Sequence, residues 1–190
     1  MNENEIAKEV VDAAYQVHRK LGPGLLETVY EVVLAYELKK RGVTDQKLKE
    51  YRRKQDFSKT IEPKGSIQET GLRRFSIQEH QATHLHYDLR LELDGVLKSW
   101  AIPKEPPTDV GVKRLAVQAE DHPLDYIYFE GIIPEGQYGA GIVSVWDKGQ
   151  FDLESREEEK IIFHLRGERL TGRYALIHTR GNQWIFFKTK

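Results

Sequence analysis

Residues 83–95, THLHYDLRLELDG, alternate between polar and apolar side chains along their whole length. This period of two predicts a β-strand with one apolar face. A solvated strand face mostly carries Lys, Thr, Ser and Glu, but this one carries two imidazoles, two carboxylates and a guanidinium, from His84, His86, Asp88, Arg90 and Glu92. Such a composition calls for a chemical explanation.

Metal binding is one explanation. His80, His86 and Asp88 form an H-x5-H-x-D set, and nitrogen and carboxylate ligands of this kind suit Mn²⁺, Fe²⁺ or Zn²⁺ with open positions for water or substrate. On a strand, His86 and Asp88 point the same way, about 7 Å apart along the backbone. His80 would have to reach the ion from the preceding turn. On the pattern alone, a metal site and a water-facing strand edge with chance histidines are equally good interpretations.

A second set of residues could bind phosphate. Gln78, Arg90, Lys104 and Arg114 can donate to phosphate oxygens, and arginine does so with two parallel hydrogen bonds. His122, in the segment EDHPLDY, is a candidate for proton transfer near neutral pH. Taken singly, Arg114 fits an exposed strand charge, Lys104 a turn residue and His122 a turn stabiliser. Combined with the metal set, they suit an anionic, phosphorus-centred transition state, which gives the hypothesis of a metal-dependent phosphoesterase.

Composition excludes several other classes. The 190 residues carry a formal net charge of −1, which argues against a protein that coats DNA nonspecifically. The chain has no cysteine, so disulfides, thiolate metal sites and cysteine nucleophiles are excluded. No apolar run approaches the ~20 residues of a membrane span, and the beginning MNENEIAKEV lacks the features of a signal peptide. The sequence therefore predicts a soluble, cytoplasmic protein with no membrane partner.

The elements that would position these residues begin with helices. Apolar residues at helical spacing run from Ile6 to Leu21 and again from Leu26 to Leu38, with Gly22-Pro23-Gly24 between them. This pattern predicts a helical hairpin within residues 1–46. Residues 47–72 are charged and little periodic, and they predict an arm or linker rather than a core element.

From residue 73 onward, strand patterns dominate. Strands are predicted at 75–78, 85–93, 96–102, 114–119, 141–146, 161–165, 173–178 and 184–188, with a hairpin turn at Asp94-Gly95. Many short strands at this spacing favour a sandwich or a barrel over alternating strands and helices. Residues 73–190 are therefore predicted to form one β domain.

Several long segments resemble a known family. Residues 75–107, 113–149 and 165–190 closely resemble the phosphoesterase domain of bacterial DNA ligase D and its free-standing archaeal and bacterial relatives, and YRRKQDFSKTIEP, residues 51–63, resembles that family's N-terminal arm. The resemblance implies an α+β, mainly β fold, with a small closed β-barrel, short flanking helices and the N-terminal hairpin. It also implies that the polar strand face forms the floor of the site inside a crescent of the barrel.

The activity that this resemblance implies is healing of DNA or RNA 3′ ends with Mn²⁺ or another divalent transition metal. A 3′-terminal ribonucleoside is removed, and the remaining 3′-phosphate is hydrolysed to a 3′-hydroxyl for repair. By motif position, the metal ligands are His80, His86 and Asp88. The positions around the metal and the scissile phosphate are Gln78, Arg90, Arg114, His122 and Tyr126. Lys104 is at a further functional position, and the arm positions that matter for the ribonuclease step are Asp56 and Glu62.

The sequence departs from the family pattern at three positions. Gln55 precedes Asp56 where the arm usually has arginine, Gln81 replaces a second histidine beside His80, and His84 stands where arginine is frequent. None of these changes removes a metal ligand. The change at Gln55 bears most on the ribonuclease step, because the arm is tied to that step.

The N-terminal segment resembles a different family. GPGLLETVY, residues 22–30, and YELKKRGV match the start of the GxxExxY family, whose members resemble PD-(D/E)XK nucleases. The match ends near Val43, before any nuclease carboxylate. We expect a helical remnant without nuclease chemistry, in which Glu27 is structural.

Two alternatives stay open at the level of sequence. One is a non-catalytic module that binds 3′ ends and positions DNA for a separate ligase or polymerase, and the other is a metal-dependent barrel acting on a small organic substrate. The near balance of charge from Tyr51 to Lys190 favours a local grip on a strand end over extended duplex binding. The expected partners are DNA or RNA primer-template 3′ ends and a separate ATP-dependent DNA ligase, in a nucleoid-associated location.

Overall fold

The computed structural model of the chain describes residues 3–21, 33–34, 37–38, 47–65 and 71–190. The chain divides into two units, Met1–Lys49 and Glu50–Lys190. In the first, helix α1 (Glu3–Leu21) buries Ala13 and Val17 and exposes Val11 and Tyr15, as an amphipathic helix does. Most of the second predicted helical stripe, Leu26 to Leu38, lies outside the described residues, so the hairpin and the division at residues 46 and 72 stay predictions.

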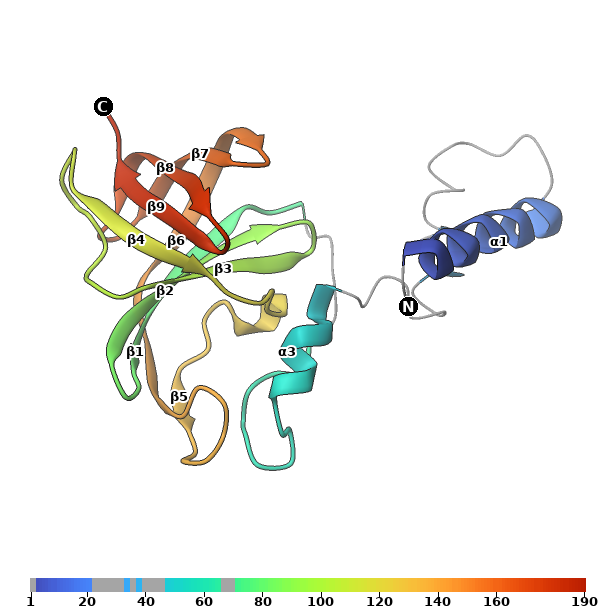
Figure 1. Ribbon diagram of the computed structural model, residues 1–190, viewed down its shortest axis with the longest axis horizontal. Helices are drawn as coiled ribbons and strands as arrows, with labels where there is room; N and C mark the ends of the chain where they lie inside the picture. Colours follow the sequence, from blue (N-terminus) through green and yellow to red (C-terminus); the bar gives the residue numbers. More distant parts are fainter. Residues whose placement is uncertain (1–2, 22–32, 35–36, 39–46, 66–70) are drawn as a thin grey trace. The chain divides into compact units, whose positions relative to one another are not determined.

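The second unit is a β-barrel (Figure 1). Its strands are β1 (Arg74–Gln81), β2 (Leu85–Leu93), β3 (Val96–Ile102), β4 (Lys113–Gln118), β5 (Gly131–Ile133), β6 (Gly141–Glu157), β7 (Lys160–Gly167), β8 (Thr171–Arg180) and β9 (Gln183–Lys188). They are hydrogen-bonded in the order β1-β2-β3-β4-β9-β8-β7-β6-β5, and an antiparallel pairing of β1 with β6 closes eight of them into a barrel. The predicted mainly β fold with a closed barrel is confirmed.

The apolar face of each strand fills the barrel interior. On β1 this face holds Phe75 and Ile77, and on β2 it holds Tyr87, Leu89 and Leu91, all buried in one cluster to which the other barrel strands contribute. Burial of each large apolar side chain stabilises the fold by about 1.5–3 kcal/mol. Because strand side chains alternate, the polar face of β1 and β2 lies on the outside of the barrel. The expectation that this face is the floor of a site inside a crescent of the barrel stays a prediction.

A second layer covers that outer polar face. It contains α3 (Lys49–Lys54) and a 3₁₀ turn, η2 (Leu124–Tyr126). Tyr51 of α3 is fully buried, packs in one apolar cluster with Leu97 and Leu124, and donates a hydrogen bond from its hydroxyl to the carbonyl of Pro63 at 2.7 Å. The segment 47–72 was predicted to contain no core element. That prediction is wrong for Tyr51, which locks the arm onto the barrel.

Strand β6 is far longer than its predicted span of 141–146. Its 17 residues pair with three other strands, because the first part pairs with β1 and β5 and the second with β7. As a result, β1 is hydrogen-bonded on both sides, with His80 opposite His86 on β2 and opposite Val143 on β6. The strand that carries His80 is therefore held firmly. Among the described residues, no helix is both long and apolar enough to cross a membrane.

Candidate active site

The three predicted metal ligands lie together on neighbouring strands. His80 is on β1, directly opposite His86 on β2, and Asp88 follows two residues later on the same face. His80 was expected to arrive from the turn, but β1 continues to Gln81, so the histidine sits within the strand ladder. One ligand atom from each residue lies within 4.8 Å of the others.

Backbone carbonyls determine which ring nitrogen each histidine presents to this cluster. His80 Nε2 donates to the Gly139 carbonyl at 2.9 Å, and His86 Nδ1 donates to the His84 carbonyl at 3.0 Å. Since a carbonyl can only accept, the proton is fixed on these nitrogens, and the lone pairs of His80 Nδ1 and His86 Nε2 remain. Metal-binding histidines are oriented in the same way by hydrogen bonds from their other ring nitrogen.

The distances within the cluster suit a shared ion better than direct hydrogen bonds. His80 Nδ1 lies 3.9 Å and His86 Nε2 lies 3.8 Å from the carboxylate oxygens of Asp88. Both separations are too long for hydrogen bonding, yet they are below twice a metal–ligand bond of about 2.1 Å. Burial lowers the pKa of His80 against the opposing effect of the Asp88 carboxylate, which favours the neutral imidazole that a metal requires.

Arg90 places a buried positive charge next to these ligands. Its guanidinium donates to Gln78 Oε1, to Ser99 Oγ at 2.8 Å and to Asp88 Oδ2 at 3.4 Å. It also lies over the Tyr126 ring, 4.6 Å from the centroid. Three of the five N–H donors of arginine are thus bonded to the protein. The residue is held rigidly and keeps donor capacity for an anion.

His122 lies next to the apolar cluster that contains Tyr51. Its Nδ1 donates to the Glu120 carbonyl at 2.9 Å, and its ring packs against Tyr51 and Tyr126 with centroid distances of 4.9 Å. Burial and the neighbouring Arg90 charge hold the pKa of His122 well below its usual range. The resting imidazole is therefore neutral, with its proton on Nδ1 and a lone pair on Nε2.

The arm contributes a buried carboxylate. Glu62 accepts hydrogen bonds from the Tyr126 hydroxyl at 2.9 Å, from Gln55 Nε2 at 3.2 Å and from Thr60 Oγ1 at 2.8 Å. Burial raises the pKa of Glu62, and it also raises the pKa of Tyr126. These contacts fix the arm against the 3₁₀ turn that carries Tyr126.

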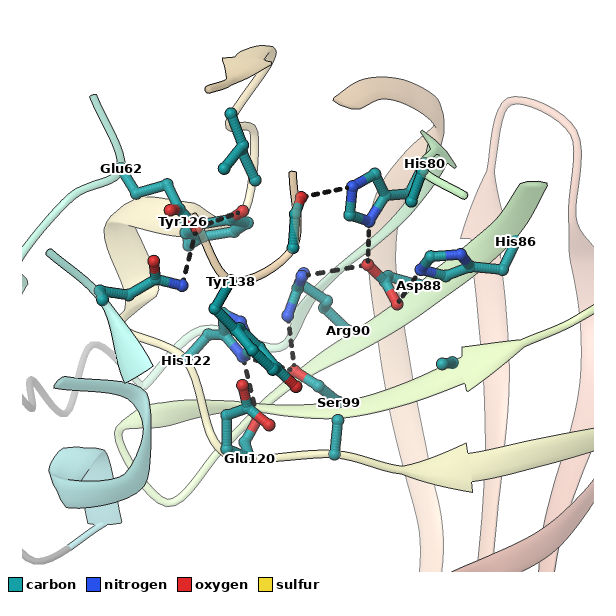
Figure 2. Close-up of a pocket in the computed structure, with 16 residues that line it drawn as sticks. Glu62, His80, His86, Asp88, Arg90, Ser99, Glu120, His122, Tyr126 and Tyr138 are labelled. Atoms are coloured by element: carbon teal, nitrogen blue, oxygen red, sulfur yellow. Dashed lines mark hydrogen bonds and ion pairs between the residues drawn. The ribbon is translucent and has the colours of Figure 1, made fainter. Parts of the chain in front are cut away.

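These groups surround one cavity of about 310 Å³ (Figure 2). Of the predicted residues, the cavity is lined by Glu62, His80, His86, Asp88, Arg90, His122 and Tyr126. Gln78 lies behind it, where it accepts from Arg90 and donates to the carbonyls of Tyr126 and Phe129. Gln78 therefore positions Arg90 and the 3₁₀ turn.

Besides Gln78, three further predicted residues do not line this cavity. Asp56 is exposed and bonded to Ser58 and Lys59, which lower its pKa to about 2. Arg114 donates to the Glu105 carbonyl at 2.8 Å, and the Lys104 side chain is exposed. Neither of these cations lines the cavity, so a role for them requires a substrate that extends beyond it.

Sequence reasoning missed other lining residues, among them Ser99, Glu120 and Tyr138. Ser99 has a weak signal, since it shares one face of β3 with Ala101, and both residues are small. Glu120 precedes the singled-out His122 by two residues. Tyr138 and Gly139 belong to a glycine-rich connection that was interpreted only as a tight turn, but the Gly139 carbonyl orients His80.

Comparison with known proteins gives two family matches. Residues 78–178 match the model of the DNA ligase D 3′-phosphoesterase domain, and residues 4–54 match a model of the PD-(D/E)XK nuclease superfamily. The second match extends beyond Val43, where the sequence resemblance was expected to end, and reaches the end of α3.

Curated relatives agree with the first match. A multifunctional non-homologous end joining protein LigD of Pseudomonas aeruginosa is 54% identical over 155 residues, which is 75% of this chain and 18% of the relative. A multifunctional non-homologous end joining DNA repair protein LigD of Mycobacterium tuberculosis is 49% identical over 76% of the chain and 20% of its own length. A multifunctional non-homologous end joining protein LigD of Mycolicibacterium smegmatis is 48% identical over 76% of the chain and 21% of its own length. The chain thus spans about a fifth of the relatives' length. The matched residues include every ligand of the cluster, and we conclude that the chain belongs to the DNA ligase D 3′-phosphoesterase domain family.

Proposed function

We propose that the protein is a Mn²⁺-dependent 3′-phosphoesterase that removes 3′-terminal ribonucleosides and 3′-phosphates and leaves 3′-hydroxyl ends for DNA repair. The observation that carries this proposal is the convergence of two oriented imidazole lone pairs and one carboxylate beside the buried Arg90 in a single cavity. We place the activity in residues 47–190, with an arm at 47–72 and the barrel at 73–190. Residues 1–46 have no catalytic role in this proposal.

His80 Nδ1, His86 Nε2 and Asp88 would hold the metal. The donor set of two imidazoles and one carboxylate fits Mn²⁺, and other divalent transition metals share this preference. When bound, the ion would neutralise negative charge on the phosphate.

The remaining residues bind and orient the phosphate. Arg90 is buried and fixed by Gln78, Ser99 and Asp88, so its remaining N–H groups hold phosphate oxygens without reorganisation. His122 presents a lone pair on Nε2, because Nδ1 carries the proton that is bonded to Glu120. It therefore acts first as an acceptor of a proton or a hydrogen bond.

The two proposed reactions differ in which bond to phosphorus is broken. In the phosphatase step, a water oxygen bonds to phosphorus, the bond from phosphorus to the 3′-oxygen breaks, and the 3′-oxygen takes a proton. Inorganic phosphate and a 3′-hydroxyl result. In the ribonuclease step, the bond from phosphorus to the 5′-oxygen of the terminal ribonucleoside breaks instead, which leaves a 3′-phosphate. Both steps develop negative charge on oxygens beside Arg90.

A primer-template that ends in one ribonucleotide tests the proposal. The protein is incubated with Mn²⁺ or with EDTA, and products are resolved at single-nucleotide resolution. We expect stepwise conversion to a 3′-phosphate and then a 3′-hydroxyl, both lost in EDTA and in His80→Ala. His164→Ala is the matched control, since His164 lies on β7, where its exposed ring contacts Glu154. No product under any condition, with Mn²⁺-dependent retention of the primer, would instead support the non-catalytic binding module.

Location and partners form part of the same proposal. An enzyme for DNA 3′ ends would act in the cytoplasm at the nucleoid, and its product would be sealed by a separate ATP-dependent DNA ligase. Addition of such a ligase to a nicked substrate with a blocked 3′ end tests this directly. Sealing should require both proteins, and sealing by the ligase alone would contradict the handover.

A further inference from the structure

A second hollow adjoins the cavity of the metal ligands. It has a volume of about 430 Å³. It shares Ala101, Ala119, Glu120 and Tyr138 with the first cavity, so the two spaces meet along a common wall. Its other lining residues come from α3, β4 and the turn before β9, namely Glu50, Lys54, Val117, Gln118 and Asn182. The function proposed above leaves this hollow unused.

The charge of the hollow does not suit a phosphate. Its cation, Lys54, is neutralised by Glu120 at 2.9 Å, and Glu50 adds a further carboxylate to the lining. Hydrogen bonds from Lys54 to Tyr138 and Glu120 raise the pKa of Lys54 despite the opposing effect of burial. A phosphate would thus be held by Arg90 in the first cavity, and an uncharged group suits the second.

The shape of the hollow suits a flat group. Ala101, Ala119 and Val117 line it with short apolar side chains, and Tyr138 adds an aromatic ring. Tyr138 is 51% exposed. The Lys54 ammonium lies over its ring at 4.4 Å from the centroid and contacts its hydroxyl at 3.0 Å. The ring is therefore held in place while much of its surface stays free, and Figure 2 shows it over the same cavity as Arg90, His122 and Glu120.

We propose that Tyr138 is a stacking platform for the base of the nucleoside next to the scissile phosphate, and that the adjoining hollow is the subsite for that nucleoside. This proposal rests on the proposed function. Every nucleobase offers a π-face, so an aromatic platform beside short apolar side chains binds bases with little sequence preference. The amides of Gln118 and Asn182 add polar groups at the far side of the hollow. Tyr138 is thus a substrate-positioning residue and takes no part in the bond changes.

The test compares ends that differ only by one base. DNA primers ending in a 3′-phosphate are prepared with a normal or an abasic terminal residue, and primers ending in one ribonucleotide with a normal or an abasic ribose. For Tyr138→Leu we expect kcat/KM to fall roughly tenfold on substrates with the base, in line with measured base–aromatic stacking, and to stay near wild type on the abasic partner. A loss on 3′-phosphate primers assigns the hollow to the retained nucleoside. A loss only on ribonucleotide ends assigns it to the departing one.

Two variants separate stacking from a structural effect. Tyr138→Phe keeps the ring and loses the hydroxyl contact to Lys54, so it should behave as wild type toward the base. Calorimetric Mn²⁺ binding should be unchanged in both variants, because Tyr138 is not a ligand, and an unchanged value shows that the neighbouring Gly139 carbonyl still orients His80. An equal loss on base-bearing and abasic ends would overturn the proposal.

If the wild type turns over none of the substrates, the proposed function fails, and fluorescence anisotropy with the same primers then decides on stacking alone. In the anisotropy measurement, a loss of affinity in Tyr138→Leu that is confined to base-bearing primers supports stacking. Equal affinities of Tyr138→Leu and wild type for these primers oppose it.

Discussion

His80 and His86 face each other across β1 and β2 with their ring centroids 4.7 Å apart, and each ring is turned by a different backbone carbonyl. The two lone pairs that remain converge near the Asp88 carboxylate. Because the carbonyls belong to the backbone, no side-chain rearrangement is needed to prepare the site. The ligand set is oriented by the fold itself.

This orientation predicts tight and specific metal binding. His80→Ala should weaken Mn²⁺ binding by more than the roughly 10- to 100-fold that loss of a hydrogen bond to a ligand costs, as measured by isothermal calorimetry. His164→Ala, in an exposed pair with Glu154, should bind Mn²⁺ as the wild type does. Equal affinities of His80→Ala and wild type would place the metal elsewhere.

Gln55 predicts a selective change in one of the two reactions. Its amide lines the cavity and donates to Glu62, and its Oε1 is buried without a partner in the described part of the chain. An arginine here would pair with Glu62 and offer further donors to the substrate. Gln55→Arg should raise the rate of ribonucleoside removal by about fivefold, equivalent to roughly 1 kcal/mol, and leave 3′-phosphate hydrolysis within twofold. Parallel rate measurements on the two substrates check this. Equal changes in both rates would refute a role of Gln55 that is confined to ribonucleoside removal.

His122 predicts a pH dependence of stability. Burial and Arg90 lower its folded-state pKa well below the ordinary 6.5, so between those two values the unfolded chain binds more protons than the folded one. The contribution of His122 is complete above about pH 6.5 and is lost as pH falls toward its lowered folded pKa, with a slope of at most about 1.4 kcal/mol per pH unit. His122→Asn should show a shallower decline in unfolding free energy between pH 7.5 and 5.

Other groups with shifted pKa values contribute equally to the stability of the wild type and of His122→Asn, so they do not affect the difference between the two curves. Burial also lowers the pKa of His80, and this contribution is the same in wild type and His122→Asn. Urea denaturation at several pH values supplies the measurement, with His164→Asn as the exposed control. A His122→Asn curve parallel to the wild type would show that His122 titrates normally.

Asp147 predicts a purely structural effect. This buried carboxylate on β6 accepts backbone hydrogen bonds from Lys148, Glu168, Arg169 and Leu170 at 2.8–3.1 Å. Asp147→Ala leaves these N–H groups without their acceptor, so the free energy of unfolding should fall by about 3 kcal/mol or more. Asp152→Ala on the same strand breaks only an exposed pair with Arg166 and should cost under about 1 kcal/mol. Chemical denaturation measures both, and a similar small loss in the two variants would contradict the anchoring role.

Local alternation was enough to predict much of the barrel. The predicted spans of β2 and β3 agree with the structure residue for residue, since both strands are strictly patterned and joined by Asp94-Gly95. The short β5 was missed, because three residues carry no period. The length of β6 was underestimated, since Gly149 and a change of partner interrupt its pattern.

The site was predicted less completely than the strands. The grouping of His80, His86 and Asp88 could be inferred from their spacing within one hairpin, and the structure confirms it. The burial of Tyr51 could not be, because a single aromatic residue in a charged segment gives no periodic signal. The carbonyl of Gly139 is invisible to any pattern of side chains. The positions of Arg114 and Lys104 depend on long-range pairing, which the sequence does not display.

The placement of all three ligands on the β1–β2 hairpin has a consequence for the order of folding. Closing a connection this short costs little chain entropy, so the hairpin and its ligand cluster can form early. By contrast, the seam between β1 and β6 joins Arg74 to Gln150 and Gln81 to Ile142, and such distant contacts are slow to form. The Gly139 carbonyl, two residues before β6, reaches His80 only when that seam forms. The nascent chain can thus bring His80, His86 and Asp88 together before the carbonyl that orients His80 is in place.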